Sequence, residues 1–332
     1  MIYSRIAGTG SELPAKIVTN HDLEQIMDTS DQWIRDRTGI RERRVISEGE
    51  TTTTLAEAAC QKAIEAAGVD PGEIDLFVMG TTTPDLVFPS SACLVQKKLG
   101  LPDCGAMDVN AACSGFMYAL SIADKYIRCG DAGKVLVCGA ETLTQVVNWE
   151  RRDTAVLFGD GAGAVVLEDS AEPGILSTHI HANGDYADLL RTDTGVSQGF
   201  GDLSHNDYKP EVEMKGNEVF KVAVRTLHRI VEETLGANDL QKSDLDWLIP
   251  HQANLRIIAA TARMLDMSMD HVVVTVDRHG NTSAASVPLA LDEAVRDGRI
   301  QRGDMASKFD DGDLHAKADT KIRHFVDACK MG

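Results

Sequence analysis

Cys113 stands where a strand is expected to give way to a helix. The preceding segment, 105–109, is short and partly apolar, as a buried strand is. The following segment repeats apolar residues at helical spacing from Phe116 to Ile127. A helix N-terminus carries unpaired N–H groups and a partial positive charge, which favour a thiolate over a thiol. We therefore expect Cys113 to be a nucleophile, with small neighbouring residues leaving room for a substrate.

Two further polar residues could act together with such a nucleophile. His251 in PHQAN and Asn281 in HGNTSAAS can supply hydrogen bonds where a reacting substrate develops negative charge. Taken singly, His251 could be a structural histidine and Asn281 a helix cap. Because both follow predicted strands, as Cys113 does, we expect all three on one side of a sheet layer.

The remaining motifs carry weaker chemical signals. Cys60, Cys93, Cys129 and Cys138 have the context of packing positions. The glycine-rich run FGDGAGAVVLE lacks the Lys-Ser/Thr end of a P-loop and leads into a β-type run, so it is interpreted as a tight turn. The histidines, cysteines and carboxylates show no spacing typical of a metal site.

The elements that must position these residues occur twice along the chain. In each half a helix, a strand, a second helix, a second strand, a turn of small residues and a third helix follow in that order. Cys113 precedes Gly130 by 17 positions, and Asn281 precedes Gly298 by the same number. Such alternation of strands and helices indicates a layered α/β architecture that arose by duplication.

The repeat divides the chain into two similar halves. The first, 1–170, carries the nucleophilic cysteine, and the second, 171–332, carries the histidine and the asparagine. Ligands of layered α/β sheets bind beyond the carboxyl ends of the strands. We therefore expect the site at the junction of the two halves.

Composition limits the class of protein. The chain has 332 residues, of which 43% are apolar, but no run of about 18 apolar residues that could span a membrane. The N-terminus lacks a secretory signal, and seven cysteines without paired spacing fit reduced thiols in the cytoplasm. The net charge of −18 argues against nucleic-acid binding. Arginines are concentrated in the segment 35–44, and we expect any single one of them to lie on a solvent-exposed helix face.

Three motifs resemble the Cys-His-Asn signature of the β-ketoacyl-acyl carrier protein synthase III family, within the thiolase-like superfamily. They are NAACSGF around Cys113, PHQAN around His251 and RHGNTSAAS around Asn281. Further motifs in order, among them DQWIRDRTGIRERR, FPSSAC and GNEVFKVAV, extend the similarity from about residue 1 to residue 304. The resemblance implies a five-layered αβαβα fold of two duplicated halves and a homodimer.

The resemblance also implies an acyltransferase that initiates fatty acid biosynthesis and needs no cofactor beyond its substrates. Cys113 would take an acyl group from acyl-CoA. Malonyl-acyl carrier protein would then lose CO2 and attack the acyl-enzyme, giving 3-ketoacyl-acyl carrier protein. His251 and Asn281 would stabilise the enolate formed by decarboxylation, as donors aimed at developing negative charge do.

Further residues match family positions around this centre. Those near the CoA entrance and the pantetheine arm are Trp33, Arg37, Arg152 and Asn254. Those expected to bound the acyl pocket are Phe88, which would cross the dimer interface, Leu143, Phe158 and Met214. Those expected to meet the acidic carrier protein are Lys221, Arg256 and Arg263. A local basic patch of this kind would steer an acidic partner to an acidic enzyme.

The tail departs from the family pattern from about residue 305. The family has an apolar strand and then a glycine-rich turn that gives a backbone N–H to the oxyanion hole. Here the chain reads GDMASKFDDGD, in which Phe309 and Gly312 are candidate remnants of that pattern. The departure keeps open a low-activity or non-catalytic homologue that binds the carrier protein. Another thiolase-like acyl-CoA condensing enzyme is the remaining alternative.

Overall fold

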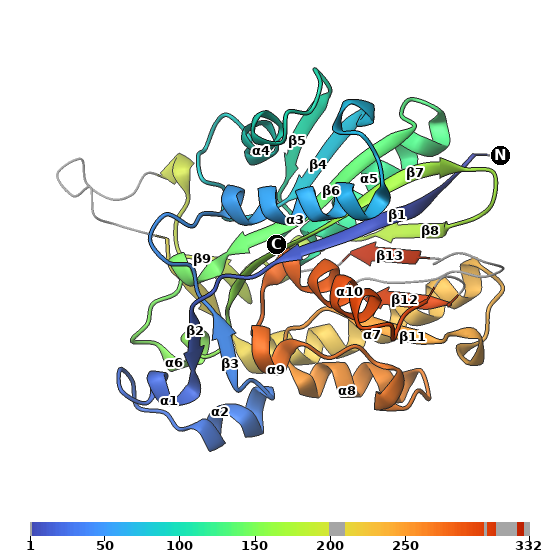
Figure 1. Ribbon diagram of the computed structural model, residues 1–332. Helices are drawn as coiled ribbons and strands as arrows, with labels where there is room; N and C mark the ends of the chain where they lie inside the picture. The colour runs from blue at the N-terminus through green and yellow to red at the C-terminus, as the bar shows by residue number, and fades with distance from the viewer. Residues whose placement is uncertain (1, 199–209, 302–303, 310–323, 329–332) are drawn as a thin grey trace.

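A five-stranded sheet and a second layer of shorter strand pairs lie between layers of helices (Figure 1). The structure is a computed structural model that describes residues 2–198, 210–301, 304–309 and 324–328. Three buried apolar clusters lie between the layers and define their order. The five-layered αβαβα fold expected from the sequence is therefore confirmed.

The first sheet is formed entirely by the N-terminal half. Its strands run in the order β1 (Tyr3–Glu12), β7 (Asp160–Ser170), β6 (Lys134–Thr142), β4 (Leu76–Gly80) and β5 (Gly105–Val109). Strand β4 is parallel to β5 and β6, whereas β7 is antiparallel to β1 and β6. Val135 and Val137 of β6 face one apolar cluster and Leu136 and Cys138 face another. Burial on both faces explains why this strand reads as a continuous apolar run.

Helices cover the outer face of this sheet. They are α3 (Thr52–Ala67) and α4 (Ser91–Leu99). Helix α3 begins at a capping box made by Thr51 and Thr54 and ends at Gly68, whose φ of 67° suits a residue without a side chain. Its apolar face, with Leu55 and Ile64, completes the outer cluster.

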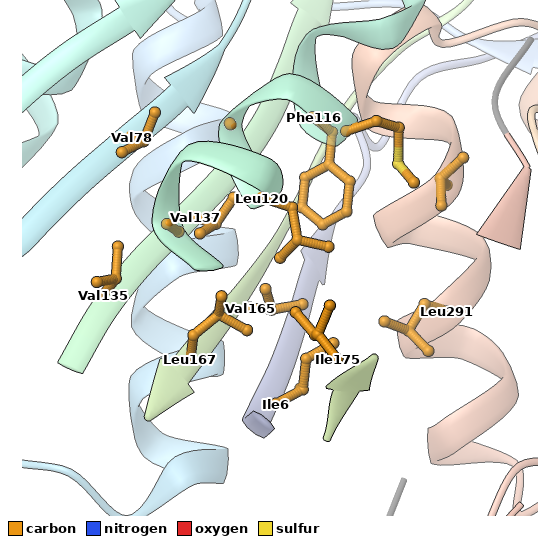
Figure 2. Close-up of a cluster of buried hydrophobic side chains, with 14 of the residues drawn as sticks. Ile6, Val78, Phe116, Leu120, Val135, Val137, Val165, Leu167, Ile175 and Leu291 are labelled. Atoms are coloured by element: carbon orange, nitrogen blue, oxygen red, sulfur yellow. The ribbon is translucent and has the colours of Figure 1, made fainter. Parts of the chain in front are cut away.

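Two helices fill the space between the sheets, α5 (Gly115–Cys129) and α10 (Ser286–Arg296). Figure 2 shows Phe116 and Leu120 of α5 and Leu291 of α10 among the aliphatic side chains of the first sheet. All three side chains are buried. This central cluster joins the two halves, because α5 comes from one half and α10 from the other.

In the described part of the chain, the second half builds two separate pairs of strands in place of one continuous sheet. Its strands are β8 (Ile175–Ile180), β11 (Trp247–Pro250), β12 (Ala306–Phe309) and β13 (His324–Ala328). Strand β11 pairs in parallel with β12, and β8 pairs in parallel with β13. Helices α7 (Gly216–Ala237) and α8 (Leu255–Met264) form the last layer, where Leu227 and Ile258 pack on Leu248.

The remaining short elements surround the ends of the strands. They are β2 (Ile17–Thr19), α1 (Asn20–Leu23), α2 (Asp31–Thr38), β3 (Glu42–Arg44), α6 (Arg152–Ala155), β9 (Leu190–Thr192), β10 (Val212–Met214) and α9 (Val276–His279). Ile34 and Ile40 belong to the same cluster as α7 and α8. The segment from β2 to β3 therefore packs against the second half, although it belongs to the first in sequence.

Arg43 contradicts the expectation that arginines of this segment are solvated. Its side chain is fully buried, and its guanidinium donates to the carbonyls of Val18 and Val156 and to Oδ1 of Asn20. Burial lowers the pKa of Arg43 to about 10, so the side chain stays charged at neutral pH. Arg43 thus ties strand β3 to a segment that lines the candidate site.

The repeat has a different register from the one predicted. Short 3-10 turns, η2 (Ala112–Ser114) and η8 (Ser283–Ala285), lead into α5 and α10, and each starts in the left-handed region, at φ 47° and 48°. Cys113 therefore corresponds to Ala284. The equal spacing to the two glycines predicted that Cys113 corresponds to Asn281, and that prediction is wrong. The two spacings are equal because Asn281 lies three residues before Ala284, while α10 (11 residues) together with Asp297 is three residues shorter than α5 (15 residues).

The second strand that the repeat predicts for the second half falls in HVVVTV, residues 271–276, and it is also wrong as a regular element. Only an isolated parallel bridge joins Val272 to Leu248 in this segment. Val272 and Val273 are nevertheless buried, so the apolar run serves the core without a continuous ladder.

The atypical tail still begins with a strand. Strand β12 pairs with β11 over four positions, and Met305 and Ala306 just before and at its start are buried. These two apolar residues reach the core, which explains why a strand forms in an otherwise polar segment. Phe309 is the last residue of β12, whereas Gly312 lies outside the described residues.

Gly139 lies at a close approach between the two halves. A side-chain carbon there would lie 2.3 Å from the carbonyl oxygen of Ala284, which belongs to the backbone of η8. We expect Gly139→Ala to lower the free energy of unfolding by about 1–3 kcal/mol, because overpacking forces the backbone to move. Urea denaturation measures this. Gly184→Ala, at a position with open space, is the control and should be near neutral, and an equally stable Gly139→Ala protein would contradict the close approach.

Candidate active site

Cys113 lies in the turn between β5 and α5, as predicted. The thiol-bearing residue is half-buried and lines a cavity of about 520 Å³. His251, directly after β11, and Asn281, two residues before η8, line the same cavity. The structure thus brings the three predicted residues together at the junction of the halves.

His251 is held as a neutral imidazole. The residue is buried, and burial lowers its pKa to about 4, so it is uncharged at neutral pH. Its Nδ1 lies 2.5 Å from the hydroxyl oxygen of Ser286, which also accepts the backbone N–H of Gln252 at 3.4 Å. With that N–H donating to it, Ser286 can direct its own proton to Nδ1. This arrangement leaves the hydrogen of the imidazole on Nε2, which is therefore a donor.

Asn281 is fixed through both its backbone and its side chain. Its N–H donates to the carbonyl of Leu157 at 2.8 Å, and its carbonyl accepts from the N–H of Gly159 at 3.0 Å. Its side-chain Oδ1 accepts the backbone N–H of Ser283 at 2.9 Å. With Oδ1 engaged, the Nδ2 amino group is the part that can donate to a substrate.

An aromatic ring between two cations marks the mouth of the cavity. The guanidinium carbons of Arg37 and Arg152 lie 4.4 and 4.6 Å from the ring centroid of Trp33. All three residues line the cavity, as predicted. A planar ring and two guanidinium groups suit a ligand with an aromatic base and phosphates.

Asn254 lines the mouth but already uses its amide within the protein. Its Oδ1 caps helix α8 by accepting the N–H of Arg256 at 2.8 Å. Its Nδ2 donates to the carbonyl of Arg37 at 2.9 Å. A contact with a pantetheine arm, predicted from the sequence, would have to share or replace these bonds.

Two of the four residues predicted for the acyl pocket line the cavity, namely Phe158 and Met214. Leu143 does not line this cavity. Leu143 is buried and packs in the same apolar cluster as Phe158, behind the wall. Phe88 lies outside the cavity of its own chain and is 83% exposed, next to the exposed Leu86 and Val87.

The sequence interpretation missed several apolar wall residues. Leu157, Leu190, Val219, Phe220, Ala223 and Ile257 line the cavity. Phe220 and Ala223 stand four and seven positions after Gly216 on α7, a helical spacing that could have identified this face. The positions of the other wall residues depend on how the loops cross the ends of the strands, which no local sequence pattern predicts.

Of the three predicted basic residues, only Arg256 reaches the cavity. It lines the mouth, and its guanidinium carbon lies 5.3 Å from the ring centroid of Phe220. Lys221 on α7 and Arg263 on α8 are exposed outside the cavity. Among the described residues, none of the three forms an ion pair with a carboxylate.

Two absences can be stated for the described part of the chain. It contains no group of three or more histidine, cysteine or carboxylate side chains that could hold a metal ion. Every helix in it is too short or too polar to span a membrane.

Comparison with known proteins identifies the family. The family model of 3-oxoacyl-[acyl-carrier-protein] synthase III matches residues 107–184, and the model of its C-terminal part matches 235–308. The chain is 64% identical over 304 residues to the beta-ketoacyl-[acyl-carrier-protein] synthase III of Xanthomonas campestris pv. campestris, covering 92% of this chain and 93% of the relative.

Solved structures similar to this chain indicate the same family. The crystal structure of 3-oxoacyl-[acyl-carrier-protein] synthase III from Aquifex aeolicus VF5 matches with a TM-score of 0.85 and 46% identity, over 92% of this chain and 94% of that one. The priming beta-ketosynthase of the R1128 polyketide pathway matches with a TM-score of 0.88 and 37% identity, over 95% and 96% of the two chains. The chain belongs to the β-ketoacyl-[acyl-carrier-protein] synthase III family, the condensing acyltransferases that initiate fatty acid biosynthesis.

Proposed function

We propose that Cys113 takes an acyl group from acyl-CoA and passes it to a malonyl unit carried by acyl carrier protein. The thiolate attacks the thioester carbonyl, CoA leaves with a proton, and an acyl-enzyme thioester remains. Malonyl-acyl carrier protein then loses CO2, and its α-carbon attacks the acyl group. The carbon–sulfur bond of the acyl-enzyme breaks, Cys113 leaves as a thiolate that takes up a proton from water, and the products are 3-ketoacyl-acyl carrier protein and CO2. No cofactor takes part in this proposal.

The observation that carries this proposal is the pair of donors that line the same cavity as Cys113. His251 is neutral with its hydrogen on Nε2, and Asn281 has its Nδ2 group available. Loss of CO2 turns the malonyl thioester oxygen into an enolate oxygen, and fixed donors stabilise charge that develops there. A neutral imidazole suits this role, since it donates without giving up a proton to the cysteine.

The mouth of the cavity supports CoA and a carrier protein as partners. Trp33, Arg37 and Arg152 offer a ring face and two cations for the nucleotide end of CoA. The protein as a whole is acidic, with a net charge of −18, so binding an acidic carrier protein requires a local basic patch. We assign that patch to Lys221, Arg256 and Arg263.

We further propose a cytoplasmic homodimer. Leu86, Val87 and Phe88 are consecutive, apolar and 50%, 68% and 83% exposed, which is unusual for a surface that faces only water. In a dimer, a second copy would cover this segment, and Phe88 of one copy would reach the acyl pocket of the other.

The cysteines support the cytoplasm as the compartment. A reducing compartment fits them, because none of those in the described part forms a disulfide.

A two-step reaction tests the proposed function. The protein is incubated with a panel of acyl-CoAs, the acyl-enzyme is detected by intact-mass spectrometry, and malonyl-acyl carrier protein is then added. We expect a mass increase by one acyl group and its discharge with release of CO2. A protein that acylates but never discharges would support the non-catalytic alternative, which relatives at 64% identity do not favour.

Arg256 is the first candidate for steering the carrier protein, because it lies at the mouth. We expect Arg256→Glu to raise the KM for malonyl-acyl carrier protein about tenfold and to leave acylation by acyl-CoA within about twofold. In the unchanged protein, higher salt should raise the same KM, since exposed charges are screened within about 10 Å at 0.1 M. Steady-state kinetics at two salt concentrations measure both effects. A KM that responds to neither change would remove the assignment.

A further inference from the structure

Glu141 is a buried carboxyl group that the proposed reaction does not use. It lies near the end of β6, its side chain is fully buried, and it does not line the cavity. Burial raises its pKa to about 7. A buried carboxyl group is costly unless its oxygens accept hydrogen bonds, so its partners indicate what it is for.

Donors from both halves of the fold converge on this carboxyl group. From the turn after β4, the hydroxyl of Thr83 donates at 2.6 Å and the N–H of Thr82 at 3.1 Å. The hydroxyls of Thr82 and Thr81 approach at 3.2 and 3.5 Å. From the second half, the hydroxyl of Ser283 donates at 3.1 Å. These contacts place Glu141 between the two halves.

The direction of the threonine bonds follows from their other partners. The hydroxyl oxygen of Thr83 accepts the N–H of Thr142 at 2.9 Å, and that of Thr81 accepts the N–H of Thr83 at 3.2 Å. With an N–H already donating to each oxygen, the hydroxyl protons are available for Glu141. The carboxyl group is therefore the common acceptor of the cluster.

Ser283 connects this cluster to Asn281. Its hydroxyl is held by Glu141, while its backbone N–H holds Oδ1 of Asn281 at 2.9 Å. Ser283 is also one of few non-glycine residues with a positive φ, 48°, a conformation that needs support from its surroundings. A displaced Ser283 would release the side chain that the reaction requires in one orientation.

We infer that Glu141 is a positioning residue that holds Ser283, and through it the amide of Asn281, in the geometry needed for decarboxylation. This inference rests on the proposed role of Asn281. Glu141 acts from the first half on a residue of the second, so the orientation of the donor depends on the junction of the halves. Acylation of Cys113 does not require that donor and should proceed without it.

Two substitutions test the inference, one at the accepting carboxyl group and one at the donating hydroxyl. Glu141→Gln keeps the shape but replaces one accepting oxygen with an amino group. Ser283→Ala removes only the hydroxyl and keeps the N–H that binds Asn281. We expect each to lower the rate of malonyl decarboxylation about 10- to 100-fold, because small misplacements of reacting groups have effects of this size. Acylation by acyl-CoA should change by no more than about twofold.

A double variant and a matched control sharpen the test. Because both substitutions break one connection, Glu141→Gln with Ser283→Ala should be no slower than the slower single variant. Ser4→Ala is the control, since it also removes a hydroxyl that donates to a buried carboxylate, Asp124, at 2.6 Å. That bond is not connected to Asn281, so the ratio of decarboxylation to acylation should stay as in the unchanged protein.

The outcomes separate the inference from the proposed function. Selective loss of decarboxylation with an unchanged melting temperature supports the inference. Decarboxylation at the normal rate in both single variants would overturn it. So would a parallel fall of both half-reactions together with the melting temperature, which is the result of a purely structural role. Asn281→Ala is measured alongside: if it decarboxylates normally, the proposed function itself fails.

Discussion

Replacing Cys113 by serine is expected to abolish acyl transfer. A serine hydroxyl is a far weaker nucleophile than a thiolate, and the neutral His251 beside it already uses Nδ1 in its bond with Ser286. We expect the rate of condensation to fall on the order of 10³-fold or more, because the acyl-enzyme no longer forms. Product formation from acyl-CoA and malonyl-acyl carrier protein, followed by mass spectrometry, measures the loss.

An exposed cysteine provides the control for this substitution. Cys93 on helix α4 lies outside the cavity, and Cys93→Ser should keep the activity of the unchanged protein. A Cys113→Ser protein that condenses at a comparable rate would show that the nucleophile lies elsewhere.

Removal of either donor beside Cys113 should have the next largest effect, and on only one half of the reaction. We expect His251→Ala and Asn281→Ala each to slow malonyl decarboxylation on the order of 10²–10³-fold, the cost of losing one donor to a developing oxyanion. Acylation of Cys113 should continue in both. Release of labelled CO2 from malonyl-acyl carrier protein and acyl transfer from labelled acyl-CoA measure the two halves separately.

The pH dependence of decarboxylation provides a check on the charge of His251. Its pKa of about 4 means that the imidazole is neutral throughout the range around pH 7. Decarboxylation should therefore show no loss that depends on His251 until the pH falls toward 4.

The alanine variants provide the outcome that would contradict the account. Condensation at the normal rate by His251→Ala or Asn281→Ala would refute the assignment of the two donors.

The layered fold and the three central residues could be predicted because their signals are local. Cys113 and His251 follow the strands β5 and β11, and strand ends bring such residues to one edge of a sheet. Asn281 follows α9 instead and is held beside them by its backbone bonds with Leu157 and Gly159. The motifs around them are also specific enough to place the chain in a family. Fold, family and the meeting of these three residues therefore follow from the sequence.

What could not be predicted depends on contacts between distant segments. In the sequence Arg43 is one of several neighbouring arginines, and only the packing of β3 against the segment around Val156 and against Gly280 buries it. Leu143 lies behind Phe158 because of the path of the chain after β6, which no spacing reports. Such positions are decided by tertiary structure.

The groups that orient the donors were missed for the same reason. Ser286 and Ser283 lie within a run of small residues that reads only as a turn, and Glu141 follows an apolar strand that reads only as core. Their roles appear when η8 is placed against β6 and the start of α10 against His251, which requires the chain to be folded. The mistaken register of the repeat has a similar origin, since α5 and α10 differ in length.

The position of the acyl group on the unchanged protein tests the central claim most directly. The protein is incubated with acyl-CoA, digested under conditions that preserve thioesters, and its peptides are sequenced by mass spectrometry. The account predicts one acyl group, on Cys113, in the peptide that contains the turn between β5 and α5. An acyl group on Cys93, Cys104 or any other residue, with Cys113 unmodified, would contradict it.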